Sequence, residues 1–198
     1  MKITAVHCKL VEVPFKNVFR TSRREVRTAK SLLVRIDLDN GPSGYGEASS
    51  APYVTGETPE SMQAMIEQFA PLIIGENPLD LERVHFIMDE KTRFNPSAKC
   101  AIDLALHDIL GRIAGQPVFR LLGGFTNVVG NDLTVSVTDP EVMAKTAVGY
   151  VERGFHTLKI KAGIRLDDDM RAIKLIRRAV GPDIHLKVDA NQGYSVDQ

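Results

Sequence analysis

The sequence predicts an α+β domain over residues 1–125. It is followed, over residues 126–198, by the first three β/α units of a (β/α)8-type, TIM-like barrel that is incomplete in this chain. Two observations support this division. Alternating apolar residues and a turn at Asp39–Gly41 predict antiparallel strands before residue 50, and helical periodicity then continues up to Gly115. After Gly124 strands and helices alternate, which is typical of a parallel sheet with right-handed crossovers.

The first fifty residues are expected to form strands. Leu32, Val34, Ile36 and Leu38 alternate with Leu33, Arg35 and Asp37, as in a strand that buries one face. Between the first two strands we expect a loop, because residues 16–25 are polar and basic. The sequence therefore predicts a small antiparallel sheet with one apolar face.

Three amphipathic helices are expected to follow these strands. Thr58 followed by Pro59 predicts the start of the first, Asn77–Pro78 the start of the second, and Ser97 the cap of the third, which Gly115 ends. Apolar residues at helical spacing predict the buried faces: Met62, Met65, Ile66, Phe69, Leu81, Val84, Met88, Ala98, Ala101, Ile102, Ala105, Ile109 and Ile113.

The second domain is expected to begin with a strand at Leu133–Val137. Asp139–Pro140 predicts the start of a helix that Gly154 ends, and the strand containing Lys159 and Lys161 follows. Asp167 is expected to cap the next helix, and Ile184–Asp189 to form the third strand. The inward residues of that helix are predicted to be Met170, Ile173, Ile176 and Val180.

Three β/α units do not close a barrel. A closed (β/α)8 barrel needs about 200 residues or more, whereas only about 70 follow residue 125. Three parallel strands would leave an open sheet edge and an uncovered apolar layer. The chain is therefore interpreted as the N-terminal portion of a longer protein, and an unusual small sheet is the alternative.

Composition and charge restrict the function classes. With 43% hydrophobic and 25% charged residues, the chain can form a core, and its net charge of zero argues against nucleic acid or an anionic membrane as a partner. Cys8 and Cys100 lack metal-binding spacing and are expected to be reduced and buried. No stretch approaches the roughly 20 apolar residues of a membrane span, and the N-terminus lacks a signal peptide. We expect a soluble, cytoplasmic protein.

Two lysines and one aspartate suggest proton-transfer chemistry. Lys159 and Lys161 point to one face of their strand, whereas Leu158 and Ile160 point to the other. In a parallel barrel the lysines would face the interior, near the end where active sites form. Repulsion between the two amines favours the neutral form of one, which can accept a proton, and Asp189 on the next strand can hold a metal ion. The alternatives are two solvated lysines and an ordinary turn aspartate.

These residues resemble a known family. The pattern Lys159-Ile-Lys161, then Asp189-Ala-Asn-Gln-Gly193, preceded by Leu121-Leu-Gly-Gly124, resembles the muconate-lactonizing branch of the enolase superfamily. The resemblance covers essentially the whole chain. Ala98–Asp108 and Tyr53–Glu57 look most like the dipeptide epimerases, which act on L-Ala-D/L-Glu and related dipeptides. The resemblance thus implies that residues 1–125 are a capping domain.

The resemblance also implies a mechanism. A divalent ion, usually Mg²⁺, binds the substrate carboxylate and stabilises an enediolate after removal of the α-proton. Lys161 matches the catalytic acid/base, and Lys159 matches its companion beside the substrate carboxylate. Asp189 matches the first metal ligand, and Asn191 matches a group close to the metal or the substrate.

Three further positions match substrate contacts. Thr134 matches a contact on the first barrel strand, and Arg24 matches an arginine in a mobile capping-domain loop that meets the side-chain carboxylate of the dipeptide. Val54 is expected at the opposite lip of the pocket. Thr134 could instead simply fill the barrel, and Arg24 lies among other arginines that could form a solvated face.

The family pattern contains groups that this sequence lacks. Two more metal-binding carboxylates and a second catalytic lysine belong to later strands, so the 198-residue chain alone is expected to be inactive and the full-length parent to epimerise dipeptides. Muconate cycloisomerisation and o-succinylbenzoate synthesis on the same scaffold are alternatives. A non-catalytic fragment that only dimerises through its capping domain is another. A homo-oligomer is expected in either case.

Overall fold

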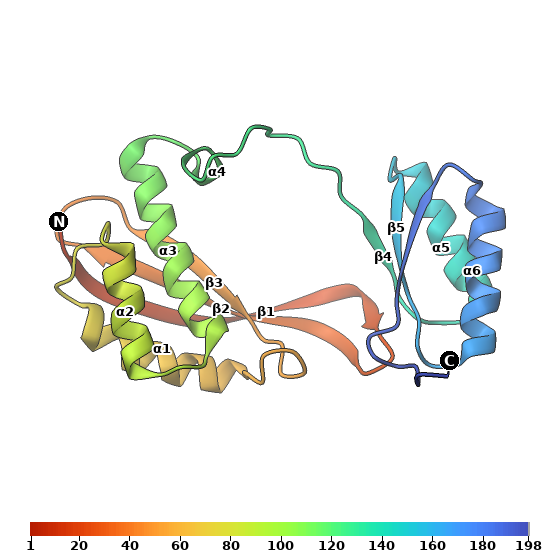
Figure 1. Cartoon of the computed structure of the whole chain (residues 1–198), viewed down its shortest axis with the longest axis horizontal. Helices are drawn as coiled ribbons and strands as arrows, with labels where there is room; N and C mark the ends of the chain where they lie inside the picture. The colour runs from red at the N-terminus through yellow and green to blue at the C-terminus, as the bar shows by residue number, and fades with distance from the viewer. Residues whose placement is uncertain (198) are drawn as a thin grey trace. The chain divides into compact units, whose positions relative to one another are not determined.

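The computed structural model describes residues 1–197. These residues form two three-stranded sheets and six helices. Figure 1 shows the chain with all of these elements except β6 labelled. In chain order they are β1 (Ile3–Arg20), β2 (Glu25–Leu38), β3 (Gly44–Ser49), α1 (Pro59–Ile73), α2 (Leu81–Lys91), α3 (Pro96–Ala114), α4 (Val118–Leu121), β4 (Leu133–Val135), α5 (Pro140–Glu152), β5 (Thr157–Lys161), α6 (Leu166–Val180) and β6 (His185–Asp189).

The described residues divide into two compact units. The first contains Met1–Val13 and Ala29–Asn127, and the second contains Pro14–Thr28 together with the residues from Val128 onward. The far end of the β1–β2 hairpin therefore belongs to the second unit, although the domain expected over residues 1–125 includes it. Each unit has its own hydrophobic core.

In the first unit the helices α1, α2 and α3 cover one face of the sheet, whose strand order is β1-β2-β3 (Figure 1). Strand β2 pairs antiparallel with β3, and its alternating residues Leu32, Val34 and Ile36 are at most 1% exposed, as the sequence predicts. A Cβ atom at Gly46 would lie only 1.9 Å from the carbonyl oxygen of Ala101. Helix α3 therefore packs directly against the backbone of β3.

The first two helices begin in different ways. Thr58 caps α1 as predicted, with Pro59 at the first helical position, and Ser61 completes a reciprocal capping box. The second helix begins at Leu81 and not at Asn77–Pro78 as predicted. The side-chain oxygen of Asn77 accepts a hydrogen bond from the backbone of Leu79 (3.2 Å), so this segment forms a turn before the helix.

The cap of α3 comes from a distant residue. Ser97 was expected to cap this helix, and that prediction is wrong, because the helix begins at Pro96 without a local side-chain cap. The buried carboxylate of Glu57 instead accepts hydrogen bonds from the backbone N–H groups of Ser97 (2.9 Å) and Ala98 (3.2 Å). This carboxylate stabilises the helix N-terminus and fixes the end of the loop that contains Val54.

The expected loop over residues 16–25 is mostly strand. Strand β1 continues to Arg20 and β2 begins at Glu25, so the turn is short. The backbone N–H of Thr21 donates to the carbonyl oxygen of Arg24 (3.0 Å), and the Thr21 hydroxyl accepts from the backbone of Arg23 (3.2 Å). The loop prediction failed because a hairpin whose residues are largely exposed is polar on both faces and lacks the usual strand alternation.

The second unit is a parallel sheet of order β4-β5-β6 with α5 and α6 on one face (Figure 1). This β-α-β-α-β arrangement confirms the predicted start of an α/β barrel. Leu158 and Ile160 of β5 are at most 1% exposed and pack with residues of both helices, including Ala147 and Ile176. The helix-facing side of the sheet is therefore apolar, and the lysines of β5 occupy its other side.

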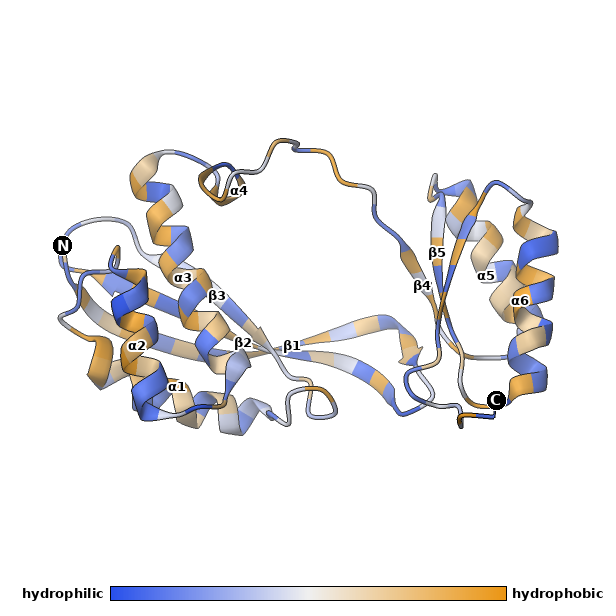
Figure 2. Ribbon diagram, in the orientation of Figure 1, coloured by the Kyte–Doolittle hydropathy of each residue, from blue (hydrophilic) through white to orange (hydrophobic). Residues whose placement is uncertain are grey.

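Helix α6 starts earlier than predicted. It begins at Leu166 and has no side-chain cap, so Asp167 lies in the first turn and does not cap it. Ala172 and Ile176 are buried, but Met170, predicted to point inward, is 48% exposed. The first turn is acidic and therefore suits the positive end of the helix dipole. Figure 2 shows the resulting contrast between hydrophilic and hydrophobic stretches of α6.

Both cysteines are free thiols. Cys8 is half-buried, and Cys100 is exposed, so the expectation that both are buried is wrong. Cys100 lies on α3 between Ala98 and Ala101, but it points away from the core that these alanines line. Among the described residues, no helix combines the length and apolar character that a membrane span requires.

Candidate active site

The last residues of β5 and β6 place a lysine beside a carboxylate. Lys161 and Asp189 are register partners across the parallel pair, and Lys161 Nζ lies 2.7 Å from Asp189 Oδ2. Lys159 Nζ lies 3.0 Å from the same oxygen. Lys161 is only 6% exposed, whereas the side chains of Lys159 and Asp189 are 36% and 30% exposed, so the cluster opens to solvent on the side of the sheet opposite to the helices.

The lysines strongly stabilise the ionised form of Asp189. The Lys161 ammonium, then that of Lys159 and the backbone N–H of Asn191, hold the pKa of Asp189 well below its ordinary value. Because the pKa is lowered by folding, the ionised carboxylate contributes stability above the ordinary pKa of about 3.9. This contribution is lost as the pH falls from that value toward the lower pKa of the folded state.

The variant Asp189→Asn tests this linkage. We expect the difference in unfolding free energy between the wild type and the variant to be largest near neutral pH and to shrink below about pH 4. Urea unfolding at a series of pH values measures this difference. A difference that is constant with pH would show that ionised Asp189 does not stabilise the fold.

Asn191, next to the cluster, has an unsatisfied side-chain oxygen. Its backbone adopts a left-handed conformation (φ 49°), which lets its N–H donate to Asp189 Oδ1 at 2.9 Å. Its side-chain oxygen is buried and has no hydrogen-bond partner among the described residues. Since a buried oxygen without a partner is costly, the atom is available for a ligand at this position.

The β1–β2 turn contributes contacts that the sequence analysis missed. The hydroxyl of Ser22 donates to the carbonyl oxygen of Ala190 at 2.9 Å, directly beside Asp189. The ring centroid of Phe19 lies 6.0 Å from Lys161 Nζ, at the outer limit of a cation–π contact. No sequence signal identifies these contacts, because Ser22 and Ala190 are 168 residues apart.

The remaining predicted site residues have different positions. Thr134 is the register partner of Lys159 on β4 and therefore lies on the lysine side of the sheet. Arg24 lies in the β1–β2 turn of the same unit and is half-buried, and its guanidinium forms no ion pair with another described residue. Val54 belongs to the first unit, where it is 83% exposed.

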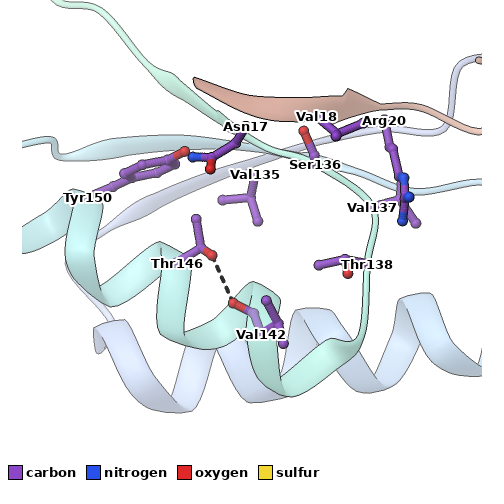
Figure 3. Close-up of a pocket in the computed structure, with 10 residues that line it drawn as sticks. All are labelled: Asn17, Val18, Arg20, Val135, Ser136, Val137, Thr138, Val142, Thr146 and Tyr150. Atoms are coloured by element: carbon purple, nitrogen blue, oxygen red, sulfur yellow. Dashed lines mark hydrogen bonds between the residues drawn. The ribbon is translucent and has the colours of Figure 1, made fainter. Parts of the chain in front are cut away.

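A cavity of about 400 Å³ lies beside β4 and is separate from this cluster (Figure 3). Residues of the hairpin, of the segment around β4 and of α5 line it, and none of them is a predicted site residue. Its one charged side chain, Arg20, is paired with Glu25 at 2.7 Å. The lining thus offers no free charge for binding an ionic substrate, and we assign the chemistry to the lysine–carboxylate cluster.

The residues of the cluster fit part of a Mg²⁺ site. Asp189 supplies a carboxylate, and the unpartnered oxygen of Asn191 lies close to it, which is the oxygen chemistry that this ion prefers. Among residues 1–197, no group of three or more His, Cys, Asp or Glu side chains could hold a metal ion. Mg²⁺ retains water molecules and also binds substrate oxygens. One carboxylate can therefore supply one of its ligands but does not form a complete site.

Family models match both parts of the chain. Residues 3–123 match the mandelate racemase / muconate lactonizing enzyme N-terminal domain, and residues 142–198 match the enolase C-terminal domain-like model. The chain belongs to the mandelate racemase / muconate lactonizing enzyme family. The enolase-superfamily resemblance is therefore confirmed, together with a capping domain followed by the start of an enolase-type barrel.

The relatives of this family member include epimerases and racemases. It is 42% identical to the hydrophobic dipeptide epimerase of Enterococcus faecalis over 98% of this chain and 55% of that protein. It is 37% identical to the N-succinyl-L-Arg/Lys racemase of Bacillus cereus (98% and 53%) and to the L-Ala-D/L-Glu epimerase of Bacillus subtilis (98% and 54%). The chain thus spans about half the length of these relatives.

A solved structure of the first relative has the same fold. The dipeptide epimerase from Enterococcus faecalis V583, complexed with Mg and the dipeptide L-Leu-L-Tyr, superimposes with a TM-score of 0.95 and 42% identity. The match covers 98% of this chain and 55% of that structure. The fold of the family member is therefore the same as that of the corresponding part of a Mg-containing epimerase.

Proposed function

We propose that this chain forms one half of the active site of an isomerase that removes and returns the α-proton next to a carboxylate. The proposed substrate is a dipeptide such as L-Ala-D/L-Glu. One observation carries the proposal, namely the convergence of the Lys159 amine and the buried Lys161 amine on Asp189 Oδ2. Proton abstraction from carbon needs a general base within reach of the proton, and a lysine amine can serve as one.

Each member of the cluster has a distinct proposed role. Lys161, the most buried, accepts the α-proton from one face of the substrate or delivers it there, and an acid/base on the part of the barrel beyond this chain would act on the opposite face, while Lys159 attracts the substrate carboxylate. Asp189 would hold Mg²⁺ with further oxygen ligands, and the bound ion would supply Lewis-acid stabilisation of the negative charge that develops on the substrate carboxylate. Asn191 would contribute its free oxygen beside the ion or the substrate.

Substrate recognition is proposed to involve the remaining predicted residues. The unpaired guanidinium of Arg24 can grip a carboxylate with two hydrogen bonds, which favours an acidic side chain in the substrate. Thr134 would contact the substrate from β4, and Val54 would form part of the pocket lip. We further propose that the protein is cytoplasmic and forms a homo-oligomer. The two free thiols support the cytoplasmic location, because the cytosol keeps thiols reduced.

Two other reactions on the same scaffold are the alternatives to epimerisation. Muconate cycloisomerisation and o-succinylbenzoate synthesis would use the same lysines, and both substrates carry carboxylates. They lack the ammonium group of a dipeptide, so a panel of substrates separates them from epimerisation. A chain that only dimerises would process none of these compounds.

The test uses a full-length barrel that contains residues 1–198, either from the native gene or completed with the remaining part of the Enterococcus faecalis epimerase. In D₂O with Mg²⁺, proton NMR should show exchange of the α-proton of L-Ala-L-Glu and formation of the D-Glu epimer. Chelation by EDTA should stop both, and the 198-residue chain alone should show neither. Turnover of muconate or a cyclohexadiene carboxylate, without dipeptide exchange, would replace the proposal by the alternative reaction.

A further inference from the structure

Asp169 is a buried carboxylate with no cation beside it. It lies in the first turn of α6 and is only 5% exposed. Its neighbour Asp168, in contrast, forms an exposed ion pair with Arg165 at 3.1 Å. Among the described residues Asp169 forms no ion pair. Because burying a carboxylate is costly unless hydrogen bonds compensate, the groups that Asp169 binds indicate its role.

Both side-chain hydrogen bonds of Asp169 converge on one oxygen. The backbone N–H of Gly163 and the hydroxyl of Tyr194 each donate to Asp169 Oδ2 at 2.8 Å. Gly163 follows shortly after Lys161 in the chain, and Tyr194 follows shortly after Asp189. A single atom therefore joins the loop that leaves β5 to the loop that leaves β6.

The two loops are packed backbone against backbone. Gly163 has a φ of +97°, and a Cβ atom there would lie 2.2 Å from the carbonyl oxygen of Ala190. A Cβ atom at Gly193 would lie 2.0 Å from the carbonyl oxygen of Gly163, and the N–H of Ala162 donates to the carbonyl of Asp189 at 3.1 Å. Because of these contacts, a shift of one loop displaces the other. The ends of β5 and β6, from which the loops leave, are therefore coupled.

We propose that Asp169 is a positioning residue for the Lys161–Asp189 pair. Its Oδ2 atom holds Gly163 and Tyr194 together and thereby keeps the ends of β5 and β6 at the separation at which the Lys161 ammonium reaches Asp189 Oδ2. The catalytic importance of the Lys161–Asp189 pair rests on the function proposed above. Burial and the hydrogen bond to Asp169 also raise the pKa of Tyr194, so its hydroxyl keeps the proton that it donates.

The experiment compares four variants of the 198-residue chain. Asp169→Ala removes the acceptor, Tyr194→Phe removes one donor, and Asp169→Asn keeps an oxygen acceptor without the charge. Asp168→Ala is the matched control, because it removes a carboxylate and its exposed ion pair with Arg165 from the same helical turn but neither hydrogen bond to Asp169 Oδ2. The readouts are the proton–nitrogen NMR signal of the Lys161 ammonium and the hydrogen-exchange rate of the Gly163 amide. Thermal unfolding is measured in parallel.

We expect Asp169→Ala and Tyr194→Phe to accelerate exchange at Gly163 and at the Lys161 ammonium by about tenfold or more, at temperatures well below unfolding. Asp169→Asn and Asp168→Ala should leave the Lys161 signal close to that of the wild type. If Asp169→Ala does not fold, Tyr194→Phe decides the result. A lower unfolding temperature with an unchanged Lys161 signal would reduce Asp169 to a purely structural role and overturn the proposal.

These measurements need neither substrate nor metal. If the full-length barrel shows no α-proton exchange, the proposed function fails while the NMR result still reports whether Asp169 positions the pair. If the NMR result is negative while the full-length barrel is active, only the positioning role fails. The two proposals can therefore be rejected independently.

Discussion

The variant Lys161→Ala, made in the full-length barrel, is expected to lower the rate of α-proton exchange by about 10²- to 10⁴-fold. Lys161 is the most buried amine of the cluster and is the proposed proton carrier on this face of the substrate. Proton NMR in D₂O, started separately from each enantiomer at the reacting carbon, measures the loss. We expect exchange to be lost most completely for the enantiomer whose α-proton faces β5.

The matched control for this prediction is Lys187→Ala. Lys187 lies in the same row of the sheet as Lys159, but it is exposed and pairs with Asp132 at 2.8 Å, away from Asp189. Its removal should change the exchange rate by less than about threefold, because its amine pairs with Asp132 and not with Asp189 and so takes no part in the proposed proton transfer. Equal losses in both variants, or undiminished exchange in Lys161→Ala, would remove Lys161 from its proposed role.

The variant Gly46→Ala is expected to destabilise the first unit by about 3 kcal/mol or more. The added Cβ would meet the carbonyl oxygen of Ala101 at 1.9 Å, and this oxygen is backbone in the middle of α3. Relief of the clash would require the helix to move away from β3 and would open the core around Ile36 and Ile102. Hydrogen exchange of the β2 amides measures the stability of this unit.

The control for that variant is the same substitution at Gly149. This glycine lies in α5 and has no atom within 4 Å of an added Cβ, so alanine should stabilise the helix by about 0.5–1 kcal/mol. Unchanged β2 exchange rates in Gly46→Ala would show that α3 can adapt and that its close packing on β3 is not needed for stability.

The central geometry of the site could be predicted from the sequence because it depends on local rules. Strand alternation sends Lys159 and Lys161 to one side, and parallel pairing of successive strands brings Asp189 to the same end. The catalytic roles of these residues stay predictions. What the sequence could not reveal is Asp169, because its two partners come from different loops and no periodic pattern marks them.

The errors in the fold have a similar origin. Thr58 caps α1 through neighbours in sequence and was predicted correctly, whereas α3 is capped by Glu57, which lies 40 residues before Ser97. The strands themselves were predicted, but the end of β1 over residues 16–20 was taken for loop because it is largely exposed and polar. Hydrophobic patterning detects burial against a core, and it carries little information where an element is exposed or where a contact joins distant parts of the chain.

The second unit is discontinuous, since its hairpin segment Pro14–Thr28 is synthesised long before the strands that it contacts. During translation, Ser22 leaves the ribosome well ahead of Ala190, its hydrogen-bond partner 168 residues later. That contact has a high contact order and must form late, after the loop-closure entropy of the intervening chain has been overcome. A cut at residue 127 would consequently separate this unit from one of its own parts, so the boundary between the two units is not a place where the chain can be divided cleanly.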